Sequence, residues 1–427
     1  MLSVFSPLIN SAPACFYYRI DVPHRALDKF GFTTGHPNPP DPREIWLQAT
    51  FQSDVAWLYM PTQLDLWNQI VDSGKQMNAI SAGNKTKYPP VFIWDADDNP
   101  DFTSPFNQSF SHSGTKDIHG NPLEEGAEVY TTDSHGDKVV LWQDKKTQLG
   151  GITFDVERNK FSEKLRKTLI RKCDGATACS PNLISYYRDA LGQKNVYFYP
   201  NTLNPEDYKY GIRAVREEPD NVVRIFWQGG QSHLHDWMPL KDAVRAVAHK
   251  YPNTKWVFMG LELPFIYDSI PASQCEFIPW RHYEAYRMTR TLMNVDINLC
   301  PLADTLFNRA KSAIKWYEST VSENTEATLA QDVGPYQEIK DGETGLLFKT
   351  PEEFAQKLGL LIEDASLRKR LGDGATKWVW SNRLPEHTTP GLIDFFNEIK
   401  DQQRARISPK IITTIPRSLT ETPGGTS

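Results

Sequence analysis

Short apolar runs alternate along the chain with longer stretches in which apolar residues recur every three or four positions. The runs have the length of strands and the longer stretches have the period of amphipathic helices. In the first half the pattern predicts strands near residues 2–8, 55–59, 91–94, 176–179 and 196–199, and helices near 23–30, 62–73, 155–172 and 180–190. Strands that alternate with helices form parallel sheets, which indicates an α/β protein.

A linker is predicted at residues 201–221, where prolines and a cluster of charged side chains interrupt the alternation. The nearly continuous apolar run at 222–227 then predicts a strand buried on both faces, as parallel sheets require. Further strands are predicted at 256–259, 276–278 and 295–299, and helices at 238–251, 282–293 and 351–363. We therefore expect two consecutive α/β units.

Residues 99–150 break the rhythm of the first unit. The segment is rich in Asn, Ser, Gly and His and carries only short alternating runs, so it predicts an elaborated loop or a small hairpin. Loops of this length are uncommon in compact domains unless they have a function. Its histidines, His112, His119 and His135, have no compact metal-ligand spacing, and we expect no metal site there.

Size and composition narrow the possible classes of protein. With 427 residues, 39% of them hydrophobic, the chain is neither a single small module nor globally disordered. A net charge of −6 is unlike that of a generic nucleic-acid binder. No apolar run reaches the roughly 20 residues of a membrane helix. Five cysteines without a C-x-x-C pair favour free thiols and a cytoplasmic location.

The segment 308–318 carries the clearest candidate chemistry. If it forms a helix with Asn308 as N-cap, then Asn308, Lys311, Lys315 and Glu318 fall within a stripe about 80° wide. Arg309 and Lys311 would neutralise a pyrophosphate, and Glu318 would accept hydrogen bonds from a ribose. The alternative is a solvated face on which Lys315 pairs with Glu318.

A glycine-containing loop follows the first strand of the second unit. Gly229 and Gly230 would let backbone amides approach a phosphate, and His233 would contact the same group. A two-glycine turn without any binding role is the alternative. No G-x-G-x-x-G follows a predicted strand, which disfavours a nicotinamide enzyme.

Several of these motifs resemble one known family. Residues 307–318, 332–336 and 341–348 resemble the donor-site helix and following turns of retaining nucleotide-sugar glycosyltransferases with the GT-B fold, in the family 4-like group (glycosyl transferases group 1) of bacteria and phages. Residues 199–201 and 230–236 are similar to its proline-asparagine signature and to its glycine loop with a downstream H-x-x-D. The resemblance covers roughly residues 155–385.

The resemblance implies two facing Rossmann-like domains with a cleft between them. The acceptor domain would span residues 1–210 and the nucleotide-sugar donor domain 221–385; a helix at 386–403 would cross back, and 404–427 would be a disordered tail. The implied activity moves a hexosyl or pentosyl group from a nucleotide-diphosphate sugar to an acceptor hydroxyl with retention. Neither a metal nor any cofactor beyond that co-substrate is implied.

One departure from the family leaves the activity open. Family members carry two acidic residues with seven between them, and the position eight before Glu318 is Ala310. A catalytically inactive GT-B scaffold that binds carbohydrate or protein partners is therefore the alternative. The acceptor itself is also left open between a glycan, a lipid-linked sugar and a modified base in phage DNA.

Two carboxylates after the predicted strand at 91–94 are the catalytic candidates. Asp97 and Asp98 end a segment, 94–98, that is similar to an acidic signature in part of the family. There they would orient an acceptor hydroxyl, and if they lie close together in an apolar cleft, like charge would raise one of their pKa values. As the alternative, they cap the next element or face solvent.

Overall fold

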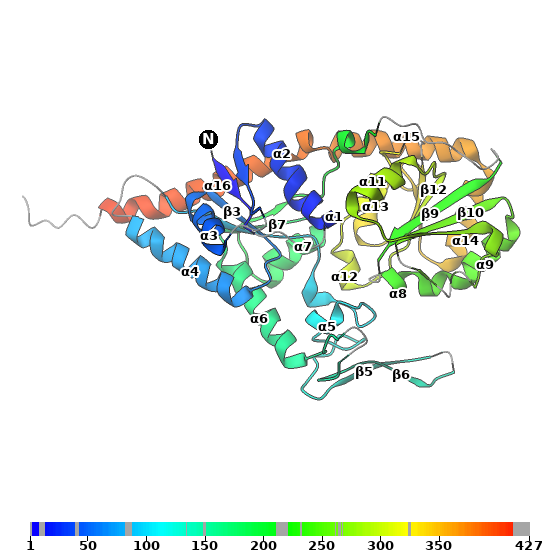
Figure 1. Cartoon of the computed structure of the whole chain (residues 1–427), viewed down its shortest axis with the longest axis horizontal. Coiled ribbons are helices and arrows are strands. Elements are labelled where there is room, and N and C mark those ends of the chain that lie inside the picture. The colour runs from blue at the N-terminus through cyan, green and yellow to red at the C-terminus, as the bar shows by residue number, and fades with distance from the viewer. Residues whose placement is uncertain are drawn as a thin grey trace, which may run out of the picture.

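The architecture comes from a computed structural model of the chain. It describes residues 2–7, 13–38, 42–81, 88–133, 135–147, 151–210, 221–230, 233–260, 262–263, 266, 268–322 and 326–412. Within these residues two six-stranded parallel sheets form separate units that face each other (Figure 1). We call them the first and the second unit.

The first unit has the strand order β2-β1-β3-β4-β7-β8. Its central strands are completely buried, as expected for a parallel sheet covered by helices on both faces. The strands are β1 (Ser3–Phe5), β2 (Thr33–Gly35), β3 (Val55–Tyr59), β4 (Val91–Ala96), β7 (Gly175–Ala178) and β8 (Val196–Phe198). The helices are α1 (Pro13–Phe16), α2 (Val22–Lys29), α3 (Arg43–Gln52), α4 (Leu64–Ser81), α6 (Val156–Lys172) and α7 (Pro181–Ser185), with a π-helical turn at Tyr17–Asp21.

The second unit has the order β11-β10-β9-β12-β13-β14. The order reverses at β9, and ligand sites of such sheets lie at the carboxyl ends of the strands around that point. Its strands are β9 (Val223–Gly229), β10 (Thr254–Gly260), β11 (Cys275–Pro279), β12 (Ile297–Cys300), β13 (Ala327–Gln331) and β14 (Leu346–Phe348). Its helices are α8 (Leu234–Trp237), α9 (Lys241–Lys250), α11 (Tyr283–Leu292), α12 (Leu306–Arg309), α13 (Ile314–Glu318), α14 (Pro351–Glu363) and α15 (Ala365–Asn382).

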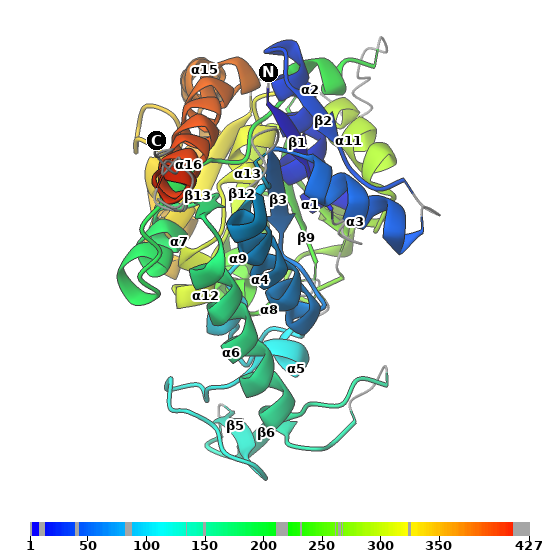
Figure 2. The ribbon, with the colours of Figure 1, turned by 90° about the vertical axis from the view of Figure 1, so that its left-hand side faces the viewer.

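The long helix α16 (Pro385–Ile412) returns from the second unit to the first (Figures 1 and 2). Leu392 and Phe396 are buried in the same apolar cluster as Val4 and Trp57 of the first unit. The predicted crossing helix is therefore present, but it continues to Ile412, so the prediction of a disordered tail from residue 404 was wrong for 404–412. Residues 413–427 lie outside the described part of the chain.

The insertion at 99–150 contains α5 (Phe110–Ser113) and an antiparallel hairpin of β5 (Glu128–Thr132) and β6 (Lys138–Gln143). It has a small apolar core of its own, which consists of Phe110, Leu123, Val129, Trp142, Phe154 and Val156. Figures 1 and 2 show the hairpin projecting away from both sheets. The predicted small hairpin is thus a separate lobe attached through α6.

Candidate active site

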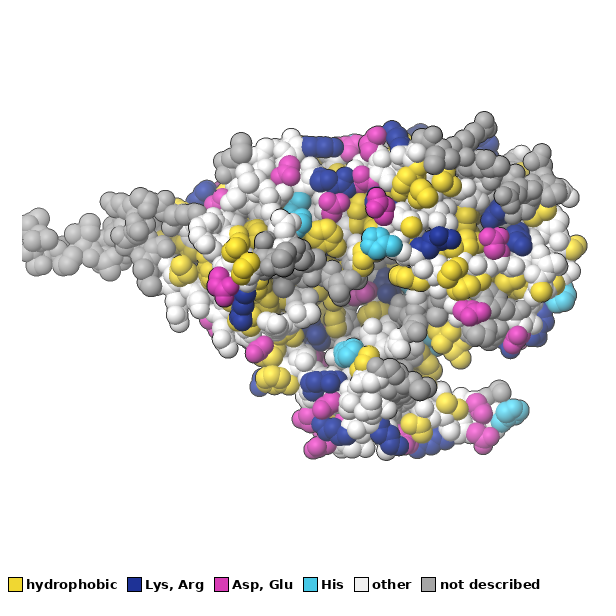
Figure 3. Space-filling model, viewed as in Figure 1, with side chains coloured by type: hydrophobic (Ala, Val, Ile, Leu, Met, Phe, Trp, Pro, Cys, Tyr) yellow, Lys and Arg dark blue, Asp and Glu magenta, His cyan; other side chains and the backbone are white. Residues whose placement is uncertain are grey.

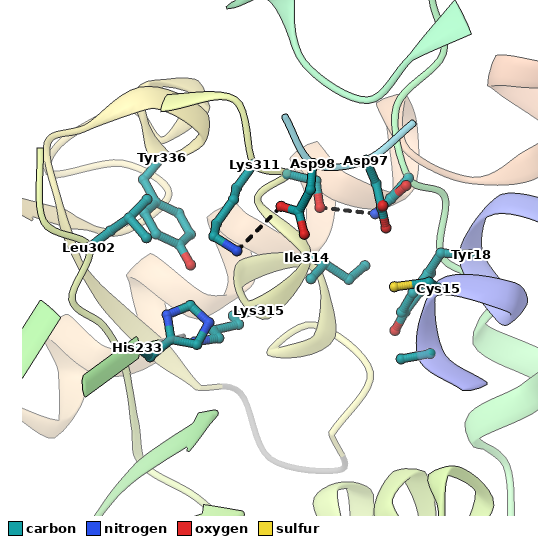
Figure 4. A pocket seen from close by; sticks show the side chains of 13 residues that line it. Cys15, Tyr18, Asp97, Asp98, His233, Leu302, Lys311, Ile314, Lys315 and Tyr336 are labelled. Atoms are coloured by element: carbon teal, nitrogen blue, oxygen red, sulfur yellow. Dashed lines mark hydrogen bonds and ion pairs between the residues drawn. The ribbon is translucent and has the colours of Figure 1, made fainter. Parts of the chain in front are cut away.

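A cleft of about 630 Å³, its open mouth included, lies between the carboxyl ends of the two sheets. The first unit contributes its N-terminal segment and the loops after β4 and β8. The second unit contributes the loops after β9, β12 and β13 and residues 311–315, which include the first turn of α13. The lining residues are Ala14, Cys15, Tyr18, Asp97, Asp98, Asn201, His233, Leu302, Lys311, Ser312, Ile314, Lys315 and Tyr336 (Figure 4).

The predicted helix over 308–318 is broken into α12 and α13. Thr305, not Asn308, caps α12, because the Thr305 hydroxyl accepts a hydrogen bond from the Asn308 amide. The Asn308 side chain is buried and donates to Asp236 and to the Ala303 carbonyl. Asn308 therefore supports the site from behind, and its predicted place at the start of a donor-site helix was wrong.

Contacts with the first unit accompany the break between the two helices. Ala310 is only 2% exposed and lies in the apolar cluster of the first unit. Its carbonyl accepts a hydrogen bond of 2.7 Å from the Ser180 hydroxyl, and the Arg309 carbonyl accepts one of 2.6 Å from Asn182. These carbonyls therefore accept hydrogen bonds from side chains of the first unit, and not from backbone amides of one continuous helix. A carboxylate at position 310 would have to be buried among apolar side chains.

Lys311 lies in the break and Lys315 in the first turn of α13, and both line the cleft (Figure 4). Lys311 Nζ lies 3.3 Å from an Asp98 oxygen, so it forms an ion pair between the units. Burial lowers the pKa of Lys311, but Asp98 and Asp236 outweigh burial and raise it above its usual value. Burial lowers the pKa of Lys315 to about 8, since this lysine forms no ion pair with a described carboxylate. Of the two lysines, Lys315 is therefore the one whose charged form a bound anion would stabilise more.

His233 connects Lys315 to a buried carboxylate. Its Nε2 lies 3.2 Å from Lys315 Nζ, and its Nδ1 lies 2.6 Å from Asp236. Burial and the charge of Lys315 lower the pKa of His233 to about 4, so the ring is neutral at physiological pH. Nδ1–H then donates to Asp236 and Nε2 accepts from the ammonium. Asp236 also accepts from the Ala303 amide and from Asn308, which fixes its position.

Asp97 and Asp98 form the opposite wall, as predicted for residues that meet a substrate. Burial and the neighbouring Asp98 raise the pKa of Asp97 to about 6, although the Tyr59 hydroxyl donates to it. Cys15 lies beside them, and burial raises the pKa of its thiol. The wall therefore carries one carboxylate committed to Lys311 and one that titrates close to neutral pH.

Arg19 was missed by the sequence reasoning. Its guanidinium is fully buried and donates to both oxygens of Asp95, to the Tyr199 carbonyl and to Asn201. Asn201 in turn donates to the Ser312 hydroxyl across the cleft at 2.9 Å. Arg19 therefore joins the ends of β4 and β8, and its partners come from the two motifs at 94–98 and 199–201.

Glu318 is 3% exposed and does not line the cleft. Its carboxylate accepts hydrogen bonds from the hydroxyls of Tyr18 and Tyr286, at 2.6 and 2.7 Å, and from the Gln228 amide at 2.6 Å. Tyr208 adds a longer contact of 3.4 Å. Of these donors only Tyr18 lines the cleft, so a ribose would have to displace the Tyr18 hydroxyl to reach Glu318.

The remaining predicted donor residues are not gathered at the cleft. Arg309 is exposed and forms an ion pair with Asp304, so the prediction that it joins Lys311 in the site was wrong in its placement. Gly229 ends β9, and a Cβ there would lie 2.5 Å from the Trp227 ring and 3.1 Å from His233. Gly230 is more open, and residues 231–232 lie outside the described part of the chain.

The insertion reaches the second unit beside this site. The Phe106 ring is stacked on His235 with centroids 4.3 Å apart and an interplanar angle of 4°. His235 immediately precedes Asp236, which holds His233. The segment with no predicted role therefore touches the loop that positions the site.

The basic helix α6 is largely occupied by intramolecular contacts. Arg166 pairs with Asp101, Lys167 with Glu163, and Lys172 with Asp72. On the face of the molecule seen in Figure 3, basic and acidic side chains are interspersed. Paired and interspersed charges of this kind are typical of a solvated helix face and not of a nucleic-acid patch.

The described residues offer neither a membrane-spanning helix nor a metal site. No helix among them is long and apolar enough to cross a membrane. No group of three or more His, Cys, Asp or Glu side chains in the described part of the chain could hold a metal ion. The prediction of a metal-independent reaction stays a prediction.

Known proteins resemble this chain in fold. No protein-family model and no curated protein matches it. Among solved structures, sucrose-phosphate synthase from Thermosynechococcus elongatus aligns over 94% of this chain and 100% of that chain, with TM-score 0.56 and 10% identity. HepE from Anabaena, solved with UDP, aligns over 93% and 100%, with TM-score 0.55 and 11% identity. A glycosyltransferase from Rickettsia africae aligns over 93% and 98%, with TM-score 0.54 and 11% identity. The predicted fold class, GT-B, is confirmed.

Proposed function

We propose that the protein is a glycosyltransferase that moves a sugar from a nucleotide-diphosphate sugar onto an acceptor hydroxyl. The observation that carries this proposal is the pair Lys311 and Lys315, which faces Asp97 and Asp98 across the cleft. A diphosphate needs cations on one side of such a cleft, and a hydroxyl acceptor needs a hydrogen-bond acceptor on the other. HepE, which has a similar fold, was solved in complex with UDP-glucose.

Lys315 is the proposed main contact of the diphosphate. Its ammonium is buried and forms no ion pair with a carboxylate in the described part of the chain, and a bound anion would stabilise the charge that burial disfavours. His233 would keep the ammonium in place through Nε2, because Asp236 fixes its tautomer. A cation at this point stabilises the negative charge that develops on the leaving diphosphate.

Asp97 is the proposed partner of the acceptor. Above its pKa of about 6 the carboxylate accepts a hydrogen bond from the attacking hydroxyl. The new bond joins the acceptor oxygen to the anomeric carbon, the bond from that carbon to the diphosphate breaks, and the hydroxyl proton passes to Asp97 or to solvent. Retention is inferred from the resemblance of residues 307–318 to the retaining family.

The proposed acceptor is a carbohydrate hydroxyl, free or lipid-linked. A modified DNA base is the weaker alternative, because four of the seven Lys and Arg residues of α6 already form ion pairs within the protein: Lys160, Arg166, Lys167 and Lys172. Metal independence is proposed because two lysines supply the positive charge that a divalent ion would otherwise bring to the leaving group.

The test is binding and slow hydrolysis of UDP-, GDP- and ADP-sugars. We expect one nucleotide class to raise the melting temperature, and Lys315→Ala to weaken its binding by tenfold or more. Lys369→Ala, which removes an exposed lysine of α15, is the matched control. If no nucleotide sugar binds at millimolar concentration, the proposed function is wrong.

A second candidate is a GT-B scaffold that binds a sugar nucleotide without turnover. Ala310, buried where the family has a carboxylate, favours it. Glu318, held by Tyr18, also favours it, since its carboxylate is already occupied. The same assay separates the two candidates, because a scaffold binds the nucleotide sugar but releases no free sugar beyond the Lys315→Ala background.

A further inference from the structure

A buried tryptophan covers the Lys315 ammonium from the side of the second sheet. Trp227 lies near the carboxyl end of β9 and is 1% exposed. Lys315 Nζ lies over its ring, 5.4 Å from the ring centroid. The negative face of an aromatic ring attracts a cation within about 6 Å, and the attraction grows when both groups are removed from water. The indole therefore stabilises the charged lysine at this point of the cleft.

His233 meets both groups from another direction. The rings of Trp227 and His233 are 6.4 Å apart with an interplanar angle of 87°, and His233 Nε2 lies 3.2 Å from Lys315 Nζ. The ammonium thus contacts a lone pair of a neutral imidazole and the π face of an indole. A carboxylate in either position would neutralise the lysine, whereas these two neutral groups hold it and leave its full charge to a ligand.

Gly229 leaves the room that this arrangement needs. A Cβ at position 229 would lie 2.5 and 3.0 Å from two ring carbons of Trp227 and 3.1 Å from the His233 ring. The Trp227 ring cannot retreat, because Trp237 and Phe258 pack against it with centroids 5.5 and 6.2 Å away. Any side chain at 229 would therefore displace one of the two rings that contact Lys315.

We propose that Trp227 is a positioning residue of the donor site, whose π face together with His233 holds the Lys315 ammonium where it meets the diphosphate. The inference rests on the proposed function and adds to it a residue that does not itself line the cleft. The alternative is a core residue only, since Trp227 belongs to the main apolar cluster of the second unit. The two roles differ in one respect: packing acts whether or not Lys315 is present, and positioning acts only through its ammonium.

A double-mutant cycle, read by calorimetric titration with UDP, separates the two roles. Trp227→Leu removes the π face and keeps an apolar side chain, and Lys315→Met keeps the stem without the charge. We expect Trp227→Leu to raise the Kd for UDP about 5- to 30-fold alone, but by less than about twofold in the Lys315→Met background. Trp227→Phe keeps a weaker π face and should restore the Kd to about two- to threefold above wild type.

Trp256→Leu is the matched control for lost packing. Trp256 is fully buried in the same apolar cluster, on β10, and has no contact with Lys315. This variant should lose stability like Trp227→Leu and bind UDP like wild type. If Trp227→Leu does not fold, Trp227→Phe takes its place in the cycle, and its two- to threefold effect should disappear in the Lys315→Met background.

The outcomes separate this inference from the proposed function. If the substitution at Trp227 weakens UDP binding equally in both backgrounds, or if Trp256→Leu weakens it as much, the positioning role is wrong while the proposed function stands. Unchanged binding in Trp227→Leu would overturn the positioning role as well. If wild type binds none of UDP, GDP and ADP, both proposals fail.

Discussion

The Lys315 ammonium lies 3.2 Å from Nε2 of His233, and the opposite nitrogen of that ring lies 2.6 Å from Asp236. The three groups form a line from a buried carboxylate to a cation at the cleft. Because the imidazole is neutral, it accepts from the lysine and does not compete with it for an anion. This line is the reason to treat Lys315 as the primary cation of the site.

Nucleotide affinity should fall as the pH rises through about 8. Burial lowers the pKa of Lys315 to about 8, so the free protein loses this charge there, and a bound diphosphate raises the pKa again. Titration of UDP at pH 8.5 in buffers of different ionisation enthalpy should show proton uptake on binding. Lys315→Arg keeps the charge and should flatten the pH dependence; an unchanged slope in that variant would contradict the assignment.

Asp97→Asn should lower activity and raise stability. The folded-state pKa of Asp97, about 6, lies above its unfolded value, so ionisation destabilises the folded protein above that pH. The variant should therefore melt higher than wild type at pH 8, and the difference should vanish below about pH 3, where Asp97 is protonated in both the folded and the unfolded state. An activity profile of the wild type should fall as the pH drops through about 6. A melting temperature lower than wild type at pH 8 would contradict the buried, unpaired state of this carboxylate.

Asp236→Asn should weaken UDP binding and lower the stability of the protein without abolishing either binding or folding. Asp236 accepts from His233, Asn308 and the Ala303 amide, and an asparagine amide nitrogen would face at least one of these donors. We expect a loss of about 1–3 kcal/mol in the free energy of unfolding and weaker UDP binding. Urea unfolding and calorimetry measure the two effects. Asp242→Asn, on the exposed face of α9, is the control and should change neither.

The alternation of apolar runs and amphipathic stretches predicted most strands of both sheets, because strands buried on two faces read as nearly continuous apolar runs. The short edge strand β2 was not predicted. Lys311 and Lys315, which were predicted to share one side of a helix, both line the cleft although Lys311 lies in the break between α12 and α13; their binding role stays a prediction. The helix break was not predictable, because the partner of the Ala310 carbonyl is Ser180, 130 residues away. Tertiary contacts of this kind override local helix propensity.

The environment of the Glu318 side chain was likewise not predictable from the local sequence. Its hydroxyl donors Tyr18 and Tyr286 and its amide donor Gln228 come from three distant segments, and no local pattern predicts that they meet. The sequence motif therefore indicated that position 318 matters but not that its carboxylate is occupied. Arg19 is similar, because its partners lie on β4 and in the loop after β8.

Glu318→Ala should act mainly on stability. Removing the carboxylate leaves Gln228 and Tyr286 without this acceptor, while the Tyr18 hydroxyl keeps Tyr208 at 2.9 Å, so we expect a loss of about 2 kcal/mol in the free energy of unfolding. Tyr18→Phe removes one donor and should cost about 1 kcal/mol. Urea unfolding measures both. If Tyr18→Phe instead tightens UDP binding severalfold without loss of stability, then the Tyr18 hydroxyl competes with the ribose for Glu318.

Ala310→Glu introduces the acidic residue that members of the similar family carry at this position. We expect that it does not increase sugar transfer. Ala310 is buried in the apolar cluster of the first unit, next to Ser180, which bonds its carbonyl. A glutamate there must either bury a charge or push the two units apart, and either result should lower the melting temperature and weaken UDP binding. Ala272→Glu, at an exposed position of the second unit, is the control and should leave both unchanged. A rise in sugar transfer for Ala310→Glu would instead place position 310 at the sugar, which requires an arrangement of the units more open than the one described.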